Sequence, residues 1–153
     1  MEQLVIHGGA GSLEGKTTEA QKMHDSLCKI WEETFEVLQK RSAEDAVRHA
    51  VRMLEDDPVY NAGTGSKLQA DGQIRMSAAL MDGTNNRFSG VINVQNIRNP
   101  IEAAALLSGE KHSILSSAQA TEFCRTKGIP VYNPETEFRL HEYKSNCAGI
   151  HGT

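Results

Sequence analysis

The chain has 153 residues, of which 39% are apolar and 24% charged, and its formal net charge is −4. This length suits one ordinary domain with its own core, and the absence of any basic run argues against a nucleic-acid surface or a polybasic membrane patch. No apolar stretch could span a bilayer, and the first residues lack a signal-peptide pattern, so we expect a cytoplasmic protein. The widely spaced Cys28, Cys124 and Cys147 predict reduced thiols, without a disulfide framework or a zinc site.

The first part of the chain predicts a short strand and two helices. Residues 4–6 are apolar and stop at a glycine-rich segment over 7–11, a pattern typical of a buried strand that leads into a tight turn. From 18 to 39 apolar residues recur every three or four positions, which predicts an amphipathic helix. Ser42 is expected to cap a second helix, with its own apolar stripe, that ends before Pro58.

The second part predicts strands followed by helices. Residues 67–70, 73–81 and 87–94 are strand-like, and Asp71-Gly72 between the first two is a hairpin signal, so we expect an antiparallel meander. A helix is expected from Asn99-Pro100 to 107 and another from 116 to 124, whereas the tail from 129 to 147 predicts a loose connector. This order of elements predicts an α+β fold.

The chain ends in Gly152-Thr153, a pair with a specific chemical use. A threonine hydroxyl is a weak nucleophile, and enzymes that use it commonly recruit the threonine's own α-amino group as the base, which requires threonine to be the first residue of a new chain. A preceding glycine leaves room for the hydroxyl to turn back onto the preceding carbonyl. By itself the pair carries little weight, because any chain must end somewhere.

A competing hypothesis concerns the glycine loop. The run Ala10-Gly11-Ser12-Leu13-Glu14-Gly15-Lys16-Thr17 matches a nucleotide-binding P-loop if alanine replaces the first glycine, with Lys16 contacting phosphate and Thr17 holding magnesium. Glu14, however, would place a carboxylate among the phosphates, and the following helix start is polar where it should be buried. The expected antiparallel meander also conflicts with the parallel sheet that such proteins need. A P-loop nucleotide-binding protein stays as a minor alternative.

Five motifs that follow one another along the chain resemble those of a known family. They are His7-Gly8-Gly9-Ala10-Gly11, Tyr60-Asn61-Ala62-Gly63-Thr64-Gly65, Met81-Asp82-Gly83, Asn96-Ile97-Arg98-Asn99-Pro100-Ile101 and Gly152-Thr153. In this order they resemble the plant-type L-asparaginase and isoaspartyl peptidase family of N-terminal nucleophile hydrolases, over residues 4 to about 125 and the last three. The resemblance implies an α-subunit domain over 1–128, a connector over 129–152 before an autocleavage site, and a β portion that starts at Thr153. The two portions would together form a four-layer αββα sandwich.

The resemblance also implies roles for single residues. Thr153 would be the nucleophile, first for its own release by cleavage of the Gly152/Thr153 bond and then for attack on the substrate. Asn61 would hydrogen-bond the nucleophilic hydroxyl or the new amine, and Gly8 and Gly9 would form a loop beside the cleavage site. No catalytic cofactor is implied, but a structural sodium ion is. Its ligands would be the backbone carbonyls of Leu54, Glu55, Asp57, Tyr60, Ala62 and Thr64.

The implied activity is hydrolysis of L-asparagine to L-aspartate and ammonia, and of isoaspartyl dipeptides, through a threonine acyl-enzyme. The implied assembly is a β subunit from the same precursor and a pair of αβ units. Residues that grip the substrate or stabilise the oxyanion would lie in the β portion, so the preference between the two substrates stays open. A glycosylasparaginase or a threonine aspartase stays an alternative within the wider family, although the glycine loop and the compact connector favour small substrates. The hypothesis from another class is a non-catalytic scaffold, a truncated or isolated α chain that binds its partner and sodium.

Overall fold

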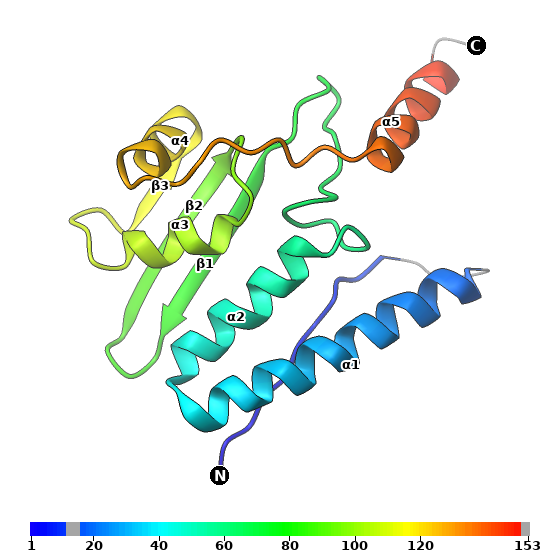
Figure 1. The fold of residues 1–153 in the computed structure, drawn as a ribbon. Helices are drawn as coiled ribbons and strands as arrows, with labels where there is room; N and C mark the ends of the chain where they lie inside the picture. Colours follow the sequence, from blue (N-terminus) through cyan, green and yellow to red (C-terminus); the bar gives the residue numbers. More distant parts are fainter. Residues whose placement is uncertain (12–15, 151–153) are drawn as a thin grey trace.

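The computed structural model describes residues 1–11 and 16–150, and this part holds five helices and a three-stranded sheet (Figure 1). The helices are α1 (Thr17–Lys40), α2 (Ala43–Asp56), α3 (Pro100–Leu107), α4 (Ser117–Thr126) and α5 (Glu137–Ile150), and the strands are β1 (Met76–Asp82), β2 (Arg87–Val94) and β3 (Ile114–Ser116). The α+β class predicted from the sequence is confirmed. None of the helices in the described part combines the length and the apolar character needed to cross a membrane.

Helices α1 and α2 form a hairpin beside the sheet (Figure 1). The predicted cap of α2 is confirmed, because Ser42 Oγ accepts a hydrogen bond of 3.1 Å from the Asp45 N–H. Ile30 of α1, Ala50 of α2 and Tyr60 beyond α2 form the buried centre of the contact. The apolar stripe of each helix therefore faces the other helix, as their three- and four-residue spacings predict.

The sheet has the order β1-β2-β3, in which β1 and β2 are antiparallel and β3 is parallel to β2. The expected three-stranded meander is therefore wrong. A turn does form at Asp71-Gly72, where Gly72 has φ +76°, but residues 67–70 are not a strand. The third strand instead follows α3, and a helical crossover of this kind returns the chain in the parallel direction.

The two faces of the sheet have different surroundings. On one face, Val91 and Val94 of β2 pack against Ala103 of α3 and Cys124 of α4 in one buried cluster. On the opposite face, large apolar side chains from all three strands are exposed. They are Met81, Phe88, Ile92 and Ile114. One layer of helices therefore covers one side of the sheet, and an apolar surface lies on the other.

Two further expectations from the sequence are wrong in part. Residues 4–6 are extended, but they pair with no strand in the described part, and Val5 is 92% exposed. The segment lies along α1 instead, where Trp31 Nε1 donates to the Leu4 carbonyl at 3.2 Å. The tail after residue 128 is irregular only at first, since α5 occupies Glu137–Ile150 and not a loose connector.

Candidate functional site

The loop after α2 is packed against the end of that helix at two glycines. Gly63 has φ +47° and Gly65 has φ +102°, conformations that residues with a Cβ rarely adopt. A Cβ on Gly63 would lie 2.2 Å from the Glu55 carbonyl oxygen, and one on Gly65 would lie 2.6 Å from that of Pro58. The Thr64 N–H also donates to the Glu55 carbonyl at 2.7 Å. The loop is thus fixed to the backbone of the helix end, with Asn61 on the stretch between them.

Asn61 is exposed and has one end of its amide fixed. Its Oδ1 accepts a hydrogen bond of 2.8 Å from the Lys67 N–H. Because the oxygen already accepts from the loop, the Nδ2 group is the end of the amide that can donate to a further group. A cavity of about 310 Å³ lies beside it, with Glu55, Arg75 and Ser77 also in its lining. This cavity, with an oriented amide donor at its edge, is the candidate functional site.

The N-terminal glycine segment meets the same loop at Tyr60. The Tyr60 ring is buried, and its hydroxyl donates to the Met23 carbonyl of α1 at 3.2 Å. A Cβ on Gly8 would lie 3.0 Å from this ring, closer than nearly all real Cβ contacts, so a side chain at residue 8 would push against the ring. Gly9 has φ +110° with open space around it, and its N–H is held by His7 Nδ1 at 3.2 Å. The structure therefore brings Gly8 next to the residue that precedes Asn61.

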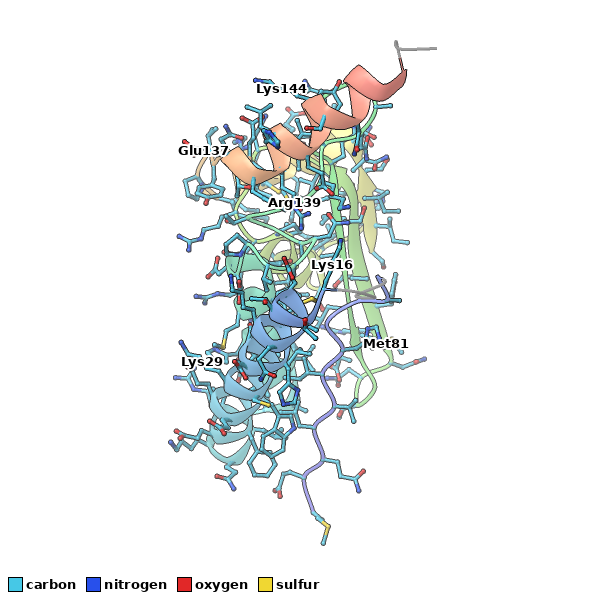
Figure 2. All side chains as sticks on the ribbon, turned by 90° about the vertical axis from the view of Figure 1, so that its right-hand side faces the viewer. Lys16, Lys29, Met81, Glu137, Arg139 and Lys144 are labelled. Atoms are coloured by element: carbon cyan, nitrogen blue, oxygen red, sulfur yellow. The ribbon has the colours of Figure 1, made fainter. Side chains whose placement is uncertain are left out.

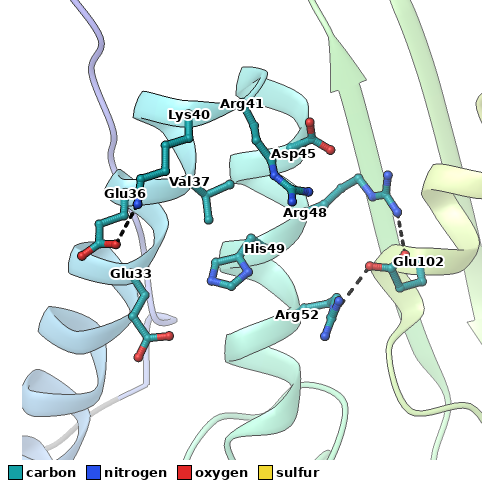
Figure 3. A pocket seen from close by; sticks show the side chains of 10 residues that line it. All are labelled: Glu33, Glu36, Val37, Lys40, Arg41, Asp45, Arg48, His49, Arg52 and Glu102. Atoms are coloured by element: carbon teal, nitrogen blue, oxygen red, sulfur yellow. Dashed lines mark hydrogen bonds and ion pairs between the residues drawn. The ribbon is translucent and has the colours of Figure 1, made fainter.

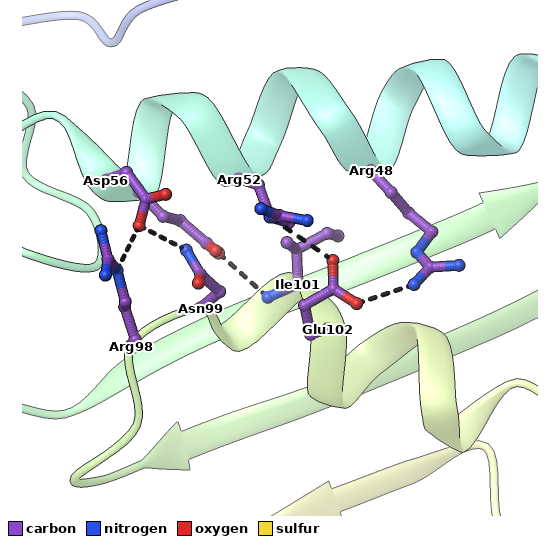
Figure 4. Close-up of polar contacts among 8 residues, drawn as sticks. Arg48, Arg52, Asp56, Arg98, Asn99, Ile101 and Glu102 are labelled. Atoms are coloured by element: carbon purple, nitrogen blue, oxygen red, sulfur yellow. Dashed lines mark hydrogen bonds and ion pairs between the residues drawn. The ribbon is translucent and has the colours of Figure 1, made fainter. Parts of the chain in front are cut away.

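Glu55 joins α2 to the start of α3. The residue is 3% exposed, and Oε1 accepts a hydrogen bond of 3.0 Å from the Ile101 N–H. Burial raises the pKa of this carboxyl from 4.5 to about 8. Next to it in the chain, Asp56 Oδ1 accepts from Arg98 Nε at 2.7 Å and from Asn99 Nδ2 at 3.0 Å (Figure 4). These contacts fix the helix end on which the loop is packed.

Backbone oxygens at this helix end are suited to a hard cation. The Leu54 carbonyl would normally accept from the residue four positions later, but that residue is Pro58, which has no N–H. The C-terminus of a helix also carries a partial negative charge. The Asp57 carboxylate is already occupied, since its oxygens accept from the Ser26 hydroxyl at 2.6 Å and the Val59 N–H at 3.0 Å. A cation here would therefore depend on main-chain oxygens, as the residues present allow.

A larger groove of about 730 Å³ lies elsewhere, between α1, α2 and α3 (Figure 3). Its charges neutralise one another, because Glu102 pairs with Arg48 at 2.7 Å and lies 3.9 Å from Arg52. Lys40 likewise pairs with Glu36 at 3.3 Å. Among the residues that the structure describes, none that the motifs single out lines this groove. We therefore place the functional site at Asn61, although the cavity there is smaller.

The remaining predicted residues lie in different parts of the chain. Leu54 is in the last turn of α2, whereas Ala62 and Thr64 belong to the packed loop, where the Thr64 hydroxyl lies 2.9 Å from that of Tyr132. Gly152 and Thr153 lie outside the described residues, as does the centre of the P-loop match, residues 12–15. The proposed nucleophile is therefore not placed relative to Asn61.

Some residues that support the site were missed by the sequence analysis. Lys67 acts through its backbone N–H, which no side-chain motif indicates. Arg139 reaches the loop from α5 and donates from Nε to the Gly65 carbonyl at 2.6 Å. The one signal for Arg139 in the sequence was a charged residue among apolar neighbours in the tail. It did not predict a buried contact, because charged residues usually face solvent.

Comparison with known proteins identifies the family. The asparaginase family matches residues 1–149, and the chain belongs to this family. It is similar to the isoaspartyl peptidase/L-asparaginase of Synechocystis sp., with 46% identity over 144 residues, which cover 92% of this chain and 43% of the relative. The protein of the same name from Nostoc sp. is 48% identical over 143 residues, 92% of this chain and 45% of the relative. The plant-type L-asparaginase of Pyrococcus horikoshii is 37% identical over 145 residues, 94% of this chain and 47% of the relative.

The chain thus spans less than half the length of these curated relatives. The resemblance inferred from the five motifs is confirmed, and the relatives' names agree with the hydrolase branch that it implied. The P-loop hypothesis gains no support, because its match lies within a segment that the asparaginase family accounts for.

The packing of Gly63 gives a test of the loop. We expect Gly63→Ala to lower the free energy of unfolding by at least about 2 kcal/mol, because the new methyl group meets the Glu55 backbone and φ is positive. Gly83→Ala is the matched control, since Gly83 is exposed with open space around its Cα. It should change the stability by no more than about 0.5 kcal/mol. Urea unfolding of both variants measures the difference, and equal stabilities would show that the loop is not packed as described.

Proposed function

We propose that this chain is the α portion of an autoprocessing, threonine-dependent hydrolase of L-asparagine and isoaspartyl dipeptides. The observation that carries the proposal is the 46% and 48% identity to two proteins named isoaspartyl peptidase/L-asparaginase, across nearly the whole chain. The chain itself supplies the amide of Asn61 beside a cavity. The remaining catalytic groups would be supplied by a β portion that begins at Thr153.

The first reaction in the proposal is cleavage of the chain before Thr153. The Thr153 hydroxyl attacks the Gly152 carbonyl carbon, and the C–N bond breaks as the acyl group moves from nitrogen to oxygen. Water then hydrolyses the ester, leaving a carboxylate on Gly152 and a free amine on Thr153. That amine is the base which the hydroxyl needs in the next reaction, since a free α-amino group titrates near pH 8, about where it must accept a proton.

The second reaction consumes the substrate. The activated hydroxyl attacks the side-chain carbonyl of asparagine or of the isoaspartyl residue, and ammonia or the downstream amino acid leaves with a proton. Water then hydrolyses the resulting aspartyl ester and restores the threonine. Asn61 takes part as a donor, because its Oδ1 is occupied by the Lys67 N–H while Nδ2 can hold the threonine hydroxyl or amine in position.

The β portion would cover the open face of the sheet. Met81, Phe88, Ile92 and Ile114 form an apolar surface there, and a second sheet packed on it would give the sandwich architecture that we propose. The extended residues 4–6 support the same assembly, since Val5 is exposed and the segment lacks a strand neighbour in the described part. By extension we propose that two αβ units pair.

The test is intact mass spectrometry of the whole protein and of a Thr153→Ala variant, after expression and incubation. The proposal predicts two fragments from the wild type, with a new N-terminus at Thr153, and one uncut chain from the variant. The cut protein should release ammonia from L-asparagine, and Asn61→Ala should lower that rate. An uncut, inactive wild type would favour the non-catalytic scaffold instead.

We propose that a sodium ion binds at the end of α2. The Leu54 carbonyl, which has no helical donor at Pro58, would hold it together with the main-chain oxygens of Glu55, Asp57, Tyr60, Ala62 and Thr64. The ion would stabilise the Asn61 loop. It supplies no chemistry to the reaction.

Sodium binding has a direct thermodynamic test. A ligand that binds only the folded state raises the melting temperature with its concentration. We expect sodium chloride, titrated against choline chloride at constant ionic strength, to raise the melting temperature by about 2 °C or more. A melting temperature that is the same in both salts would contradict the sodium site.

A further inference from the structure

The segment from Tyr132 to Tyr143 lies along the loop that follows Asn61. Near its start, the Gly65 N–H donates to the Pro134 carbonyl at 3.2 Å. Near its end, the Tyr143 hydroxyl donates to the Ala70 carbonyl at 3.2 Å. The two stretches are about seventy positions apart in sequence, as these pairs show. The contacts therefore attach the region before α5, and its first two turns, to the loop.

The main attachment is Arg139. Its side chain is almost wholly buried, with a residue exposure of 8%, and its Nε donates to the Gly65 carbonyl at 2.6 Å. The other side of the guanidinium is paired as well, since Nη1 donates to Glu142 Oε2 at 2.9 Å. A buried arginine with both contacts made fixes a loop carbonyl firmly, whereas its loss would leave that carbonyl without a partner.

Glu142 extends the contact towards Asn61. Its Oε1 accepts from Lys67 Nζ at 2.9 Å, and the backbone N–H of the same Lys67 holds Asn61 Oδ1 at 2.8 Å. Hydrogen bonds to Lys67 and Arg139 lower the pKa of Glu142, so the carboxylate remains ionised near neutral pH. A chain of direct contacts thus runs from α5 through Lys67 to the Asn61 amide.

We propose that Arg139 and Glu142 are positioning residues for Asn61, acting through Gly65 and Lys67. The segment over 132–143 is then a permanent part of the functional site and not a spacer before the cleavage bond. The proposal rests on the proposed function in one respect, because the effect on turnover depends on Asn61 orienting the nucleophile. The structural part of the proposal, that contacts from α5 order the loop, does not depend on any reaction.

The experiment compares Arg139→Leu, Glu142→Gln and Arg139→Lys with the wild type in the whole protein. Hydrogen–deuterium exchange with mass spectrometry measures the order of residues 61–72, and steady-state kinetics measures turnover per cleaved molecule. Lys144→Gln is the matched control, since Lys144 is exposed on the same helix, and Figure 2 shows it pointing away from the body of the protein while Arg139 points towards it.

We expect Arg139→Leu to speed exchange in residues 61–72 and to lower kcat about tenfold or more with KM unchanged, because a misplaced amide impairs the reaction and not the binding. Arg139→Lys, which keeps a donor and the charge, should recover part of kcat, and Lys144→Gln should match the wild type. If Arg139→Leu unfolds the whole protein, Glu142→Gln decides, with faster exchange in residues 61–72 expected. Unchanged exchange there in the folded variants would overturn the proposal.

The two readouts separate this proposal from the proposed function. A wild type that neither cleaves itself nor hydrolyses asparagine contradicts the proposed function, while the exchange of residues 61–72 still decides the mechanical role of Arg139. Faster exchange with an unaltered kcat would overturn the positioning role.

Discussion

The contact on which the site depends is the one between the Gly63–Gly65 turn and residues 55–58, which form the end of α2 and the chain just after it. A Cβ on Gly63 would lie 2.2 Å from the Glu55 carbonyl oxygen, and one on Gly65 would lie 2.6 Å from that of Pro58. The two backbones are therefore too close for any residue with a Cβ. Glycine loses more conformational entropy on folding than any other residue. Here the cost is offset by the hydrogen bond from Thr64 to the Glu55 carbonyl and by the burial of Tyr60. Asn61 acquires its fixed place because both neighbouring stretches are fixed.

The loop is held from two sides by different means. On the α2 side the support is packing and a buried carboxyl, with Glu55 bonded to the first turn of α3. On the α5 side the support is a chain of charged groups, from Arg139 through Glu142 to Lys67. Packing of this kind is insensitive to salt, whereas the half-exposed Lys67–Glu142 pair is partly screened. The buried Arg139 is therefore the stronger of the two links from α5.

Local patterns in the sequence predicted the parts of the fold that depend on local interactions. The α1 and α2 helices, the Ser42 cap and the β1–β2 hairpin follow from periodicity, capping and turn chemistry within a few residues. The parallel strand β3 was missed because its pairing with β2 forms across α3, and three residues carry little pattern of their own. The helix α5 was missed because the prolines and charges before it resemble a linker, while what anchors it is a contact with Gly65.

In the candidate site, too, only the features that depend on local sequence could be predicted. The motif around Asn61 identified the loop, and together with the other four motifs it identified the family, because residue types at fixed spacings are visible in a sequence. The groups that orient Asn61 were not visible, since they are a backbone N–H and side chains from a helix about seventy positions away. The apolar sheet face was likewise hidden, because alternation in β1 and β2 does not tell which face a partner covers.

The central claim is that Asn61 is pre-oriented as a donor towards the residue that follows Gly152. A crystal structure of the whole, cleaved protein tests it most directly through the distance from Asn61 Nδ2 to the Thr153 hydroxyl and amine. The account predicts one of these distances within about 3.2 Å, with Asn61 Oδ1 still bonded to the Lys67 N–H. A Thr153 placed away from Asn61, or an Asn61 amide released from Lys67, would contradict it.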